Sequence, residues 1–327
     1  MDAEAPKPET GQAEPDPVGR RKRLIAAWAA LPPVTRGILL MLISTVGFAA
    51  MHVLVRYVSA ELHAFQIAFF RNVFGLLVFL PLMLSDNFAV LRTRRLGLHG
   101  VRALLNVTAM LCFFTALSLS PVAQVTALGF TAPIFAAVLG VVWLRERFHI
   151  RRWTAIGLGF LGTLVILRPG FVAIDLGSLL TLISAGLWAA TMIVIKILGR
   201  TESSLTITAY MNILLAILSL VPALLFWRTP SAEAWIWLAV IGVLGTIAQI
   251  ALAQSLKEAE ASIVMPFDFF RLIWAAALGY LLFTEVPDAF VWMGGAIIVL
   301  STSYIAYRES RLRRRSTLDP PSASAAP

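Results

Sequence analysis

The stretch AAVLGVVWLRE, residues 136–146, has a counterpart in AAALGYLLFTE, residues 275–285. Both read Ala-Ala-x-Leu-Gly and then, after five further residues, Glu, and both lie near the end of a long apolar run. Glu146 stands between two arginines, whereas Glu285 has no basic neighbour. The chain therefore contains one element twice and places basic residues beside only one copy, and this difference bears directly on the fold.

The composition of the chain is that of a membrane protein. Of its 327 residues, 59% are hydrophobic and 14% charged, and the mean hydropathy is +0.82. Soluble domains do not combine these values. Ten apolar segments recur, most of them close to the ~20 residues that a helix needs to cross a bilayer. They cover residues 37–59, 64–84, 99–118, 121–144, 153–168, 177–198, 206–227, 235–255, 261–283 and 289–307. Their apolar runs are continuous rather than alternating, which argues against a membrane β-barrel.

The two ends of the chain differ in composition from the apolar segments. Residues 1–36 are acidic and proline-rich and then basic, which predicts a disordered cytoplasmic tail. Residues 308–327 are basic and then of low complexity, which predicts a second cytoplasmic tail. Two prolines, rather than small residues, follow the short apolar stretch 24–31, so we expect no cleaved signal peptide. Between the tails we expect a first repeat over residues 37–168 and a second over residues 177–307.

Lysine and arginine indicate the orientation, because the cytoplasmic loops of membrane proteins are enriched in them. With a cytoplasmic amino terminus, 22 of the 27 basic residues fall in inner segments, two in outer loops and three within spans. We therefore expect a multi-pass protein of a bacterial-type inner membrane with both termini in the cytoplasm. The same distribution explains the basic pI without any nucleic-acid partner.

The orientation accounts for the unequal copies of the repeated element. Five spans separate Glu146 from Glu285, and because five is odd, the second copy lies upside down relative to the first. The arginines beside Glu146 then lie in the cytoplasm, and their absence beside Glu285 fits an outer position. We expect an all-α membrane protein of ten transmembrane helices, arranged as two five-helix repeats of inverted topology.

The repeated element and its surroundings resemble the drug/metabolite transporter superfamily, and within it the EamA-type permeases. The motifs that carry the resemblance are Pro133 with Glu146 thirteen residues later, Arg71 in FQIAFFRNVFG, GLGFLG at 157–162, and the second copy ending in Gly279 and Glu285. The resemblance extends from Gly37 to Tyr307. It implies a transporter built from two five-helix halves.

One departure from the family pattern concerns the second copy, which has Leu272 where the proline would stand. The wording PFDFFRLIWAAALGYLLFTEVPD, residues 266–288, looks most like the branch that includes S-adenosylmethionine uptake proteins and riboflavin transporters. That likeness implies a small ring-bearing metabolite as the substrate.

In such a fold the substrate should bind near the membrane midplane, so buried polar residues are the candidates for contact. Arg271 lies about midway along the ninth apolar segment, where an unpaired charge would cost at least ~3 kcal/mol. Asp268 precedes it by three residues, within reach on a helix. This pair either binds a charged or zwitterionic substrate or joins the helix to its neighbours, and we expect the binding role.

Other side chains within the spans are candidates for substrate contact through a charge, an amide or an aromatic ring. They are Gln249, Gln254, Phe270, Trp274 and Arg71. For Arg71 the alternative is a side chain that snorkels to the interface. His52 and Asp268 are the candidates for proton coupling, with a packing role as the alternative for the histidine. Arg56 is expected to be an interfacial anchor.

A polytopic membrane enzyme is a distant alternative. Such an enzyme needs clustered acids or metal ligands, for example paired aspartates or a His-Glu-x-x-His motif. Neither occurs, and the four histidines are scattered, at positions 52, 63, 99 and 149. We therefore expect no catalytic residues, no metal and no cofactor.

The sequence predicts a secondary transporter that works by alternating access. We expect uptake of a neutral or zwitterionic ring-bearing metabolite, riboflavin-like or S-adenosylmethionine-like, with an amino-acid or amine exporter as the alternative. The expected partners are this small molecule and the lipid bilayer. The oligomeric state stays open, with a homodimer among the options.

Overall fold

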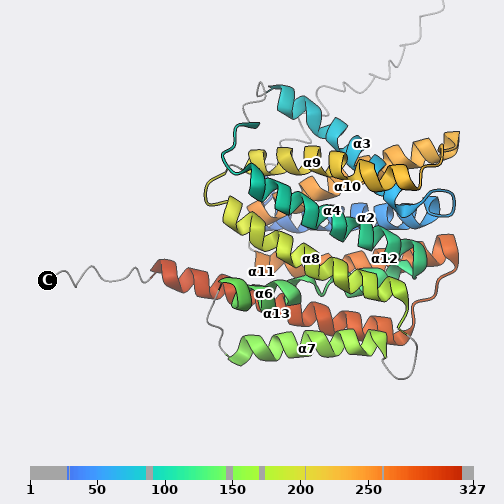
Figure 1. The fold of residues 1–327 in the computed structure, drawn as a ribbon. Coiled ribbons are helices and arrows are strands. Elements are labelled where there is room, and N and C mark those ends of the chain that lie inside the picture. Colours follow the sequence, from blue (N-terminus) through green and yellow to red (C-terminus); the bar gives the residue numbers. More distant parts are fainter. Residues whose placement is uncertain are drawn as a thin grey trace, which may run out of the picture.

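The fold is known from a computed structural model, which describes residues 28, 30–85, 91–144, 150–168, 174–202, 204–259 and 261–318. Every regular element in these ranges is helical, and the helices lie side by side in one bundle (Figure 1). The elements are α2 (Pro33–Val58), α3 (Ala64–Ser85), α4 (Leu96–Leu119), α5 (Val122–Gly129), α6 (Ala132–Leu144), α7 (Ile150–Leu167), α8 (Leu176–Leu198), α9 (Ser204–Leu225), α10 (Ala232–Glu258), α11 (Ala261–Val264), the 3₁₀ helix η2 (Met265–Phe269), α12 (Phe270–Phe283) and α13 (Ala289–Leu318).

These helices have the lengths and the surface of a membrane protein. Seven segments are long and apolar enough to span a bilayer, and three shorter apolar helices stand at the remaining predicted positions: Ala64–Val78, Ile156–Leu167 and Ala289–Tyr304. Large apolar side chains point outward, with Leu225 75% exposed and Val286 77% exposed. Such a surface suits lipid and would be an aggregation hazard in water. The predicted all-helical class is confirmed for the described residues.

Two of the predicted spans are interrupted, and a proline explains each interruption. The fourth span is divided into α5 and α6, and Pro133 lacks the N–H that would bond to the carbonyl of Gly129. The ninth span is divided into α11, η2 and α12, with Pro266 in the first turn of η2. We expected both spans as continuous segments, so the structure adds a break near the middle of the fourth and close to the start of the ninth.

Small residues and hydroxyl groups hold the central helices together. α2 packs along α10 and α12, α4 packs along α8, and the pairs α3–α9 and α7–α13 lie on opposite sides of the bundle (Figure 1). Ser44 Oγ donates to the carbonyl of Ala248 at 2.9 Å, and Ser255 Oγ donates to that of Gly37 at 2.7 Å. Because the hydrophobic effect does not drive helices together in lipid, hydroxyl-to-carbonyl hydrogen bonds of this kind help to hold them in contact.

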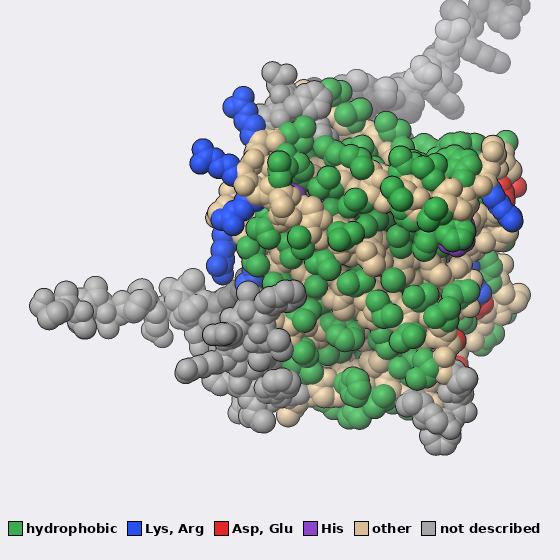
Figure 2. All heavy atoms as spheres, viewed as in Figure 1, with side chains coloured by type: hydrophobic (Ala, Val, Ile, Leu, Met, Phe, Trp, Pro, Cys, Tyr) green, Lys and Arg blue, Asp and Glu red, His purple; other side chains and the backbone are tan. Residues whose placement is uncertain are grey.

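Charged side chains divide between the two ends of the bundle (Figure 2). One end, called here the basic end, is where α2 and α4 begin and α8 and α10 end, and it carries Arg36, Arg92, Arg94, Arg95, Lys196, Arg200 and Lys257. The opposite acidic end carries Glu61, Asp175, Glu233, Glu285 and Asp288, together with Arg56 and Arg168, which are paired with two of these acids. The apolar surface lies between them (Figure 2). The first span begins at the basic end, where Arg36 pairs with Glu258, and α13 ends there as well.

Candidate functional site

The interrupted ninth span carries the central feature of the bundle, an ion pair that is mostly buried. Nη2 of Arg271, on the first turn of α12, donates to both carboxylate oxygens of Asp268 in η2. The Arg271 guanidinium carbon lies 5.2 Å from the ring centroid of Phe48 on α2 and 5.3 Å from that of Phe130. Phe130 stands in the break between α5 and α6. The predicted pair therefore forms, and rings from two other spans cover it.

His52 extends this group of residues one helical turn along α2. Its ring centroid lies 6.3 Å from that of Phe48 and 4.9 Å from that of Phe113 on α4. The side chain is buried, and Nδ1 has no hydrogen-bond partner among the described residues. We call Asp268, Arg271, Phe48, Phe130 and His52 the central cluster. It combines a neutralised ion pair, an imidazole with a free nitrogen and stacking surfaces.

Arg71 lies beside the central cluster rather than at the edge of the membrane. Its Nη1 donates to Oδ1 of Asn72 at 3.0 Å and contacts Sδ of Met110, on α4, at 3.8 Å. A Cβ built on Gly245 of α10 would lie 3.2 Å from Nε of Arg71 and 2.7 Å from Sδ of Met51, the residue before His52, so the guanidinium reaches the α2 side of the bundle. The guanidinium thus points into the bundle, which is the geometry required for contact with a substrate.

The remaining candidates lie outside the central cluster. Gln254 is exposed and donates to Oε1 of Glu258 at 3.0 Å, near the basic end. Gln249 is half-buried on α10. Phe270 and Trp274 are 38% and 37% exposed on the outer side of α12. The rings that contact Arg271 are instead Phe48 and Phe130, which no sequence motif distinguished from other aromatic residues.

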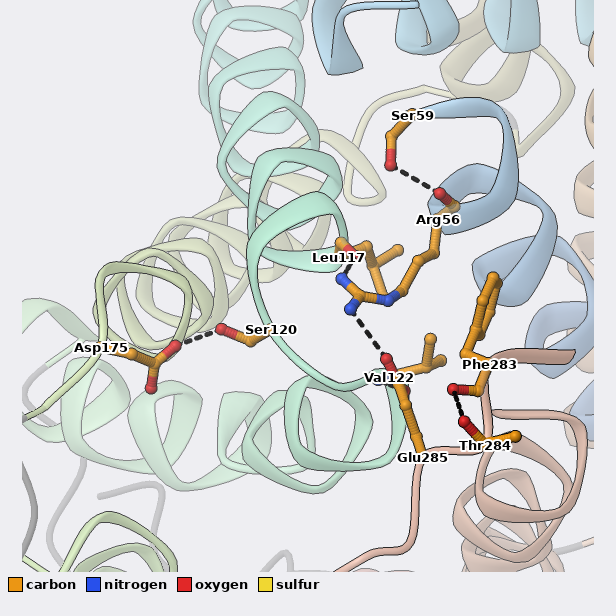
Figure 3. A network of polar contacts seen from close by, with 9 residues as sticks. All are labelled: Arg56, Ser59, Leu117, Ser120, Val122, Asp175, Phe283, Thr284 and Glu285. Atoms are coloured by element: carbon orange, nitrogen blue, oxygen red, sulfur yellow. Dashed lines mark hydrogen bonds and ion pairs between the residues drawn. The ribbon is translucent and has the colours of Figure 1, made fainter. Parts of the chain in front are cut away.

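A second polar group closes the acidic end of the bundle (Figure 3). Nη2 of Arg56, at the end of α2, lies 2.8 Å from Oε1 of Glu285, and Nη1 donates to the carbonyl of Leu117 at 3.0 Å. Oε2 of Glu285 accepts from the backbone N–H of Val122, the first residue of α5, at 3.1 Å. The carboxylate thereby satisfies a free N–H at a helix start. Arg56 is thus more than the expected interfacial anchor, since it joins α2 to α4 and to the loop that follows α12.

Asp175 organises a cavity of about 360 Å³ at the same end. It precedes α8 and accepts from the backbone N–H of Ser178 at 3.1 Å, from Nε2 of Gln124 at 3.1 Å and from Oγ of Ser120 (Figure 3). Burial raises the pKa of Asp175, but the hydrogen bonds from Ser120 and Ser178 outweigh it and hold the pKa below its ordinary value. The carboxylate is therefore charged at neutral pH.

Two predicted features stand apart from these groups. Glu146 and its flanking arginines lie outside the described residues. Among the residues that are described, no group of three or more His, Cys, Asp or Glu side chains is placed to hold a metal ion.

Comparison with known proteins identifies the family. The model of the EamA-like transporter family matches residues 35–168 and 175–307, which together are more than half of the chain. The chain belongs to the EamA-like transporter family. The protein is therefore a membrane transporter and not an enzyme.

Named relatives cover nearly the whole chain. A riboflavin transporter of Vibrio cholerae is 33% identical over 285 residues, which are 86% of this chain and 96% of the relative. An S-adenosylmethionine uptake transporter of Rickettsia felis is 30% identical over 88% of this chain and 97% of its own. A pseudopaline exporter of Pseudomonas aeruginosa is 28% identical over 81% of this chain and 94% of its own. The resemblance drawn from the motifs is confirmed.

Proposed function

We propose that this transporter takes up a neutral or zwitterionic ring-bearing metabolite, riboflavin-like or S-adenosylmethionine-like. The observation that carries the proposal is the central cluster, where Phe48 and Phe130 lie against Arg271 of the ion pair and His52 packs beside Phe48. Aromatic rings can stack on a flat ligand, and the ion pair and imidazole can hydrogen-bond to its polar edge. Relatives named for riboflavin transport and S-adenosylmethionine uptake support the same substrate class.

Transport would occur by alternating access between two inverted repeats. Counted in chain order, α2 packs on α10 as span one on span eight, and α8 packs on α4 as span six on span three. Matching each span to the one five positions away pairs span one with span six and span eight with span three. The two contacts are therefore equivalent under the repeat. The interrupted spans, four and nine, are also five apart. This exchange supports an inverted repeat with the binding site between its halves.

The orientation belongs to the same proposal. The basic end would face the cytoplasm of a bacterial-type inner membrane, because cytoplasmic segments are enriched in lysine and arginine. The Arg56–Glu285 bridge would then lie at the outer surface. His52 and Asp268 remain the candidates for proton coupling, and Nδ1 of His52 has no hydrogen-bond partner among the described residues.

An exporter is the second candidate function. The relative named as a pseudopaline exporter shows that the resemblance extends to a protein named for export. An ion pair in the central cluster could hold the carboxylate and the ammonium of an amino acid or amine equally well.

Uptake into proteoliposomes tests the proposal. Purified protein is reconstituted and supplied with labelled riboflavin or labelled S-adenosylmethionine, and accumulation is followed with and without an imposed proton gradient. We expect saturable uptake of one of them by the wild-type protein. Gly157→Ala is the control variant and should transport equally well, because a Cβ at this glycine meets open space. Absence of uptake of both, together with export of amino acids from loaded vesicles, would move the assignment to the exporter.

A further inference from the structure

Arg71 is a membrane-embedded cation without a counter-charge in the described part of the chain. The ion pairs formed there join Arg36 to Glu258, Arg56 to Glu285, Arg168 to Asp288 and Arg271 to Asp268. Arg71 takes part in none of them, and its two polar partners, Asn72 and Met110, are both neutral. The guanidinium is held in place, but its charge is not balanced.

The position of this charge is deep. Arg71 lies seven residues beyond the start of α3, Met110 nine residues before the end of α4 and Gly245 thirteen residues beyond the start of α10. All three of these helix ends are at the acidic end. At ~1.5 Å per residue the surroundings of the guanidinium are ~10–20 Å below that end. The side chain points toward the middle of the bundle and not back to the interface.

The backbone of α10 makes room for the guanidinium. A Cβ added to Gly245 would stand 3.2 Å from Nε and 3.5 Å from Nη2 of Arg71, and 2.7 Å from Sδ of Met51. Neither Nε nor Nη2 makes a hydrogen bond to a described residue. The N–H groups of Nε and Nη2 are therefore free to donate hydrogen bonds on the side of α2, where His52 and the central cluster lie.

An unbalanced cation at this depth is costly unless it meets an anion or water. Resting on the proposed function, we propose that Arg71 binds a carboxylate of the transported metabolite. The substrate is then a ring-bearing carboxylate, closer to S-adenosylmethionine than to uncharged riboflavin. Arg271 suits this purpose less well, because Asp268 already balances its charge.

The first arm of the test compares two probes that differ only in the carboxylate. Binding of S-adenosylmethionine and of decarboxylated S-adenosylmethionine is measured by calorimetry on the purified full-length protein. We expect wild type to prefer the carboxylated probe about 10- to 100-fold, and Arg71→Met to lose that preference while retaining its affinity for the decarboxylated one. Arg71→Lys, which keeps the charge, should retain part of the preference. Equal binding of both probes by wild type would overturn the proposal.

The second arm needs no ligand and keeps the proposal testable if neither probe binds. Removing an unbalanced, partly buried charge should leave the Tm of the ligand-free protein unchanged or higher, so Arg71→Met should be at least as stable as wild type. Arg271→Met is the matched control and should lower the Tm, because it leaves Asp268 unpaired. A drop in Tm for Arg71→Met as large as that for Arg271→Met would overturn the proposal, because it would show that Arg71 stabilises the fold.

The two arms separate this proposal from the broader one. Riboflavin uptake that Arg71→Met leaves unchanged would overturn the carboxylate assignment and leave the proposed function intact. No binding of riboflavin or of either adenosyl probe, with a stable Arg71→Met, would overturn the proposed substrates and still support Arg71 as an anion site.

Discussion

At the scale of single residues, replacing one member of the Asp268–Arg271 ion pair and replacing both should have different effects on stability. Asp268 is only 8% exposed, so Arg271→Met would leave a buried carboxylate without its partner. We expect this variant to lose about 3–5 kcal/mol of stability and to give a low folded yield. Asp268→Asn/Arg271→Met removes both charges and should recover most of the stability without recovering transport.

Thermal unfolding in detergent and uptake in proteoliposomes measure the two effects separately. Wild-type uptake by the double variant would show that the pair only joins α12 to its neighbours. A single variant as stable as wild type would contradict the burial of the pair.

A second residue-scale prediction concerns pH and Asp175. Its pKa is lowered in the folded protein, so its charge stabilises the fold at pH values above the ordinary carboxyl pKa. That contribution is lost as the pH falls through the folded-state value. Asp175→Ala should cost about 1 kcal/mol at pH 7 through loss of the α8 cap, and the difference from wild type should shrink below about pH 4.

Asp175→Asn is the matched variant, because asparagine also caps helices but cannot carry the charge. Its loss of stability at pH 7 should be smaller than that of Asp175→Ala and should change less with pH. Tm values measured from pH 7 to pH 3 check this, and a constant difference for Asp175→Ala over that range would contradict it.

At the scale of elements, the contact between α7 and α13 depends on glycine. A Cβ added to Gly162 would stand 2.8 Å from the carbonyl oxygen of Gly294 and 2.9 Å from Ile298, so the two backbones would have to separate. We expect Gly162→Ala to cost about 1–3 kcal/mol, as overpacking does. Gly157→Ala, on the same helix but facing open space, should be neutral or stabilising by up to about 1 kcal/mol. Equal Tm values for the two variants would refute this account of the contact.

At the scale of the whole molecule, the Arg56–Glu285 bridge should resist opening of the acidic end. Glu285→Gln removes the charge that holds Arg56, and losing about 1–2 kcal/mol would raise the open fraction about 5- to 30-fold. The chain has one cysteine, so a Cys112→Ser background allows a single reporter thiol at Ala123, which is buried beside the cavity. Its labelling by a membrane-impermeant maleimide should become faster in Glu285→Gln.

Glu61→Gln supplies the control, because Glu61 bonds to Ser231 at the same end but does not contact Arg56. Equal labelling in both variants would mean that the bridge does not limit opening.

Topology is a further whole-molecule prediction. Reporter fusions after residues 36 and 315 should both report the cytoplasm, and a fusion after Glu285 should report the outside. The expectation follows from the excess of basic residues at one end of the bundle (Figure 2). A cytoplasmic report at Glu285 would contradict both the orientation and the inverted repeat.

The sequence by itself determined the features that depend on neighbours along the chain. Membrane character and the extents of the spans follow from the hydropathy of ~20-residue windows, whatever the packing. The Asp268–Arg271 pair was predictable because residues three apart meet on any helix. Tertiary structure decided which residues meet between spans: the rings over Arg271, the bridge from Arg56 to Glu285, and the exposure of Gln254. The physical reason is that a span apolar on most sides does not specify its rotation about its own axis, and only packing against the other helices sets it.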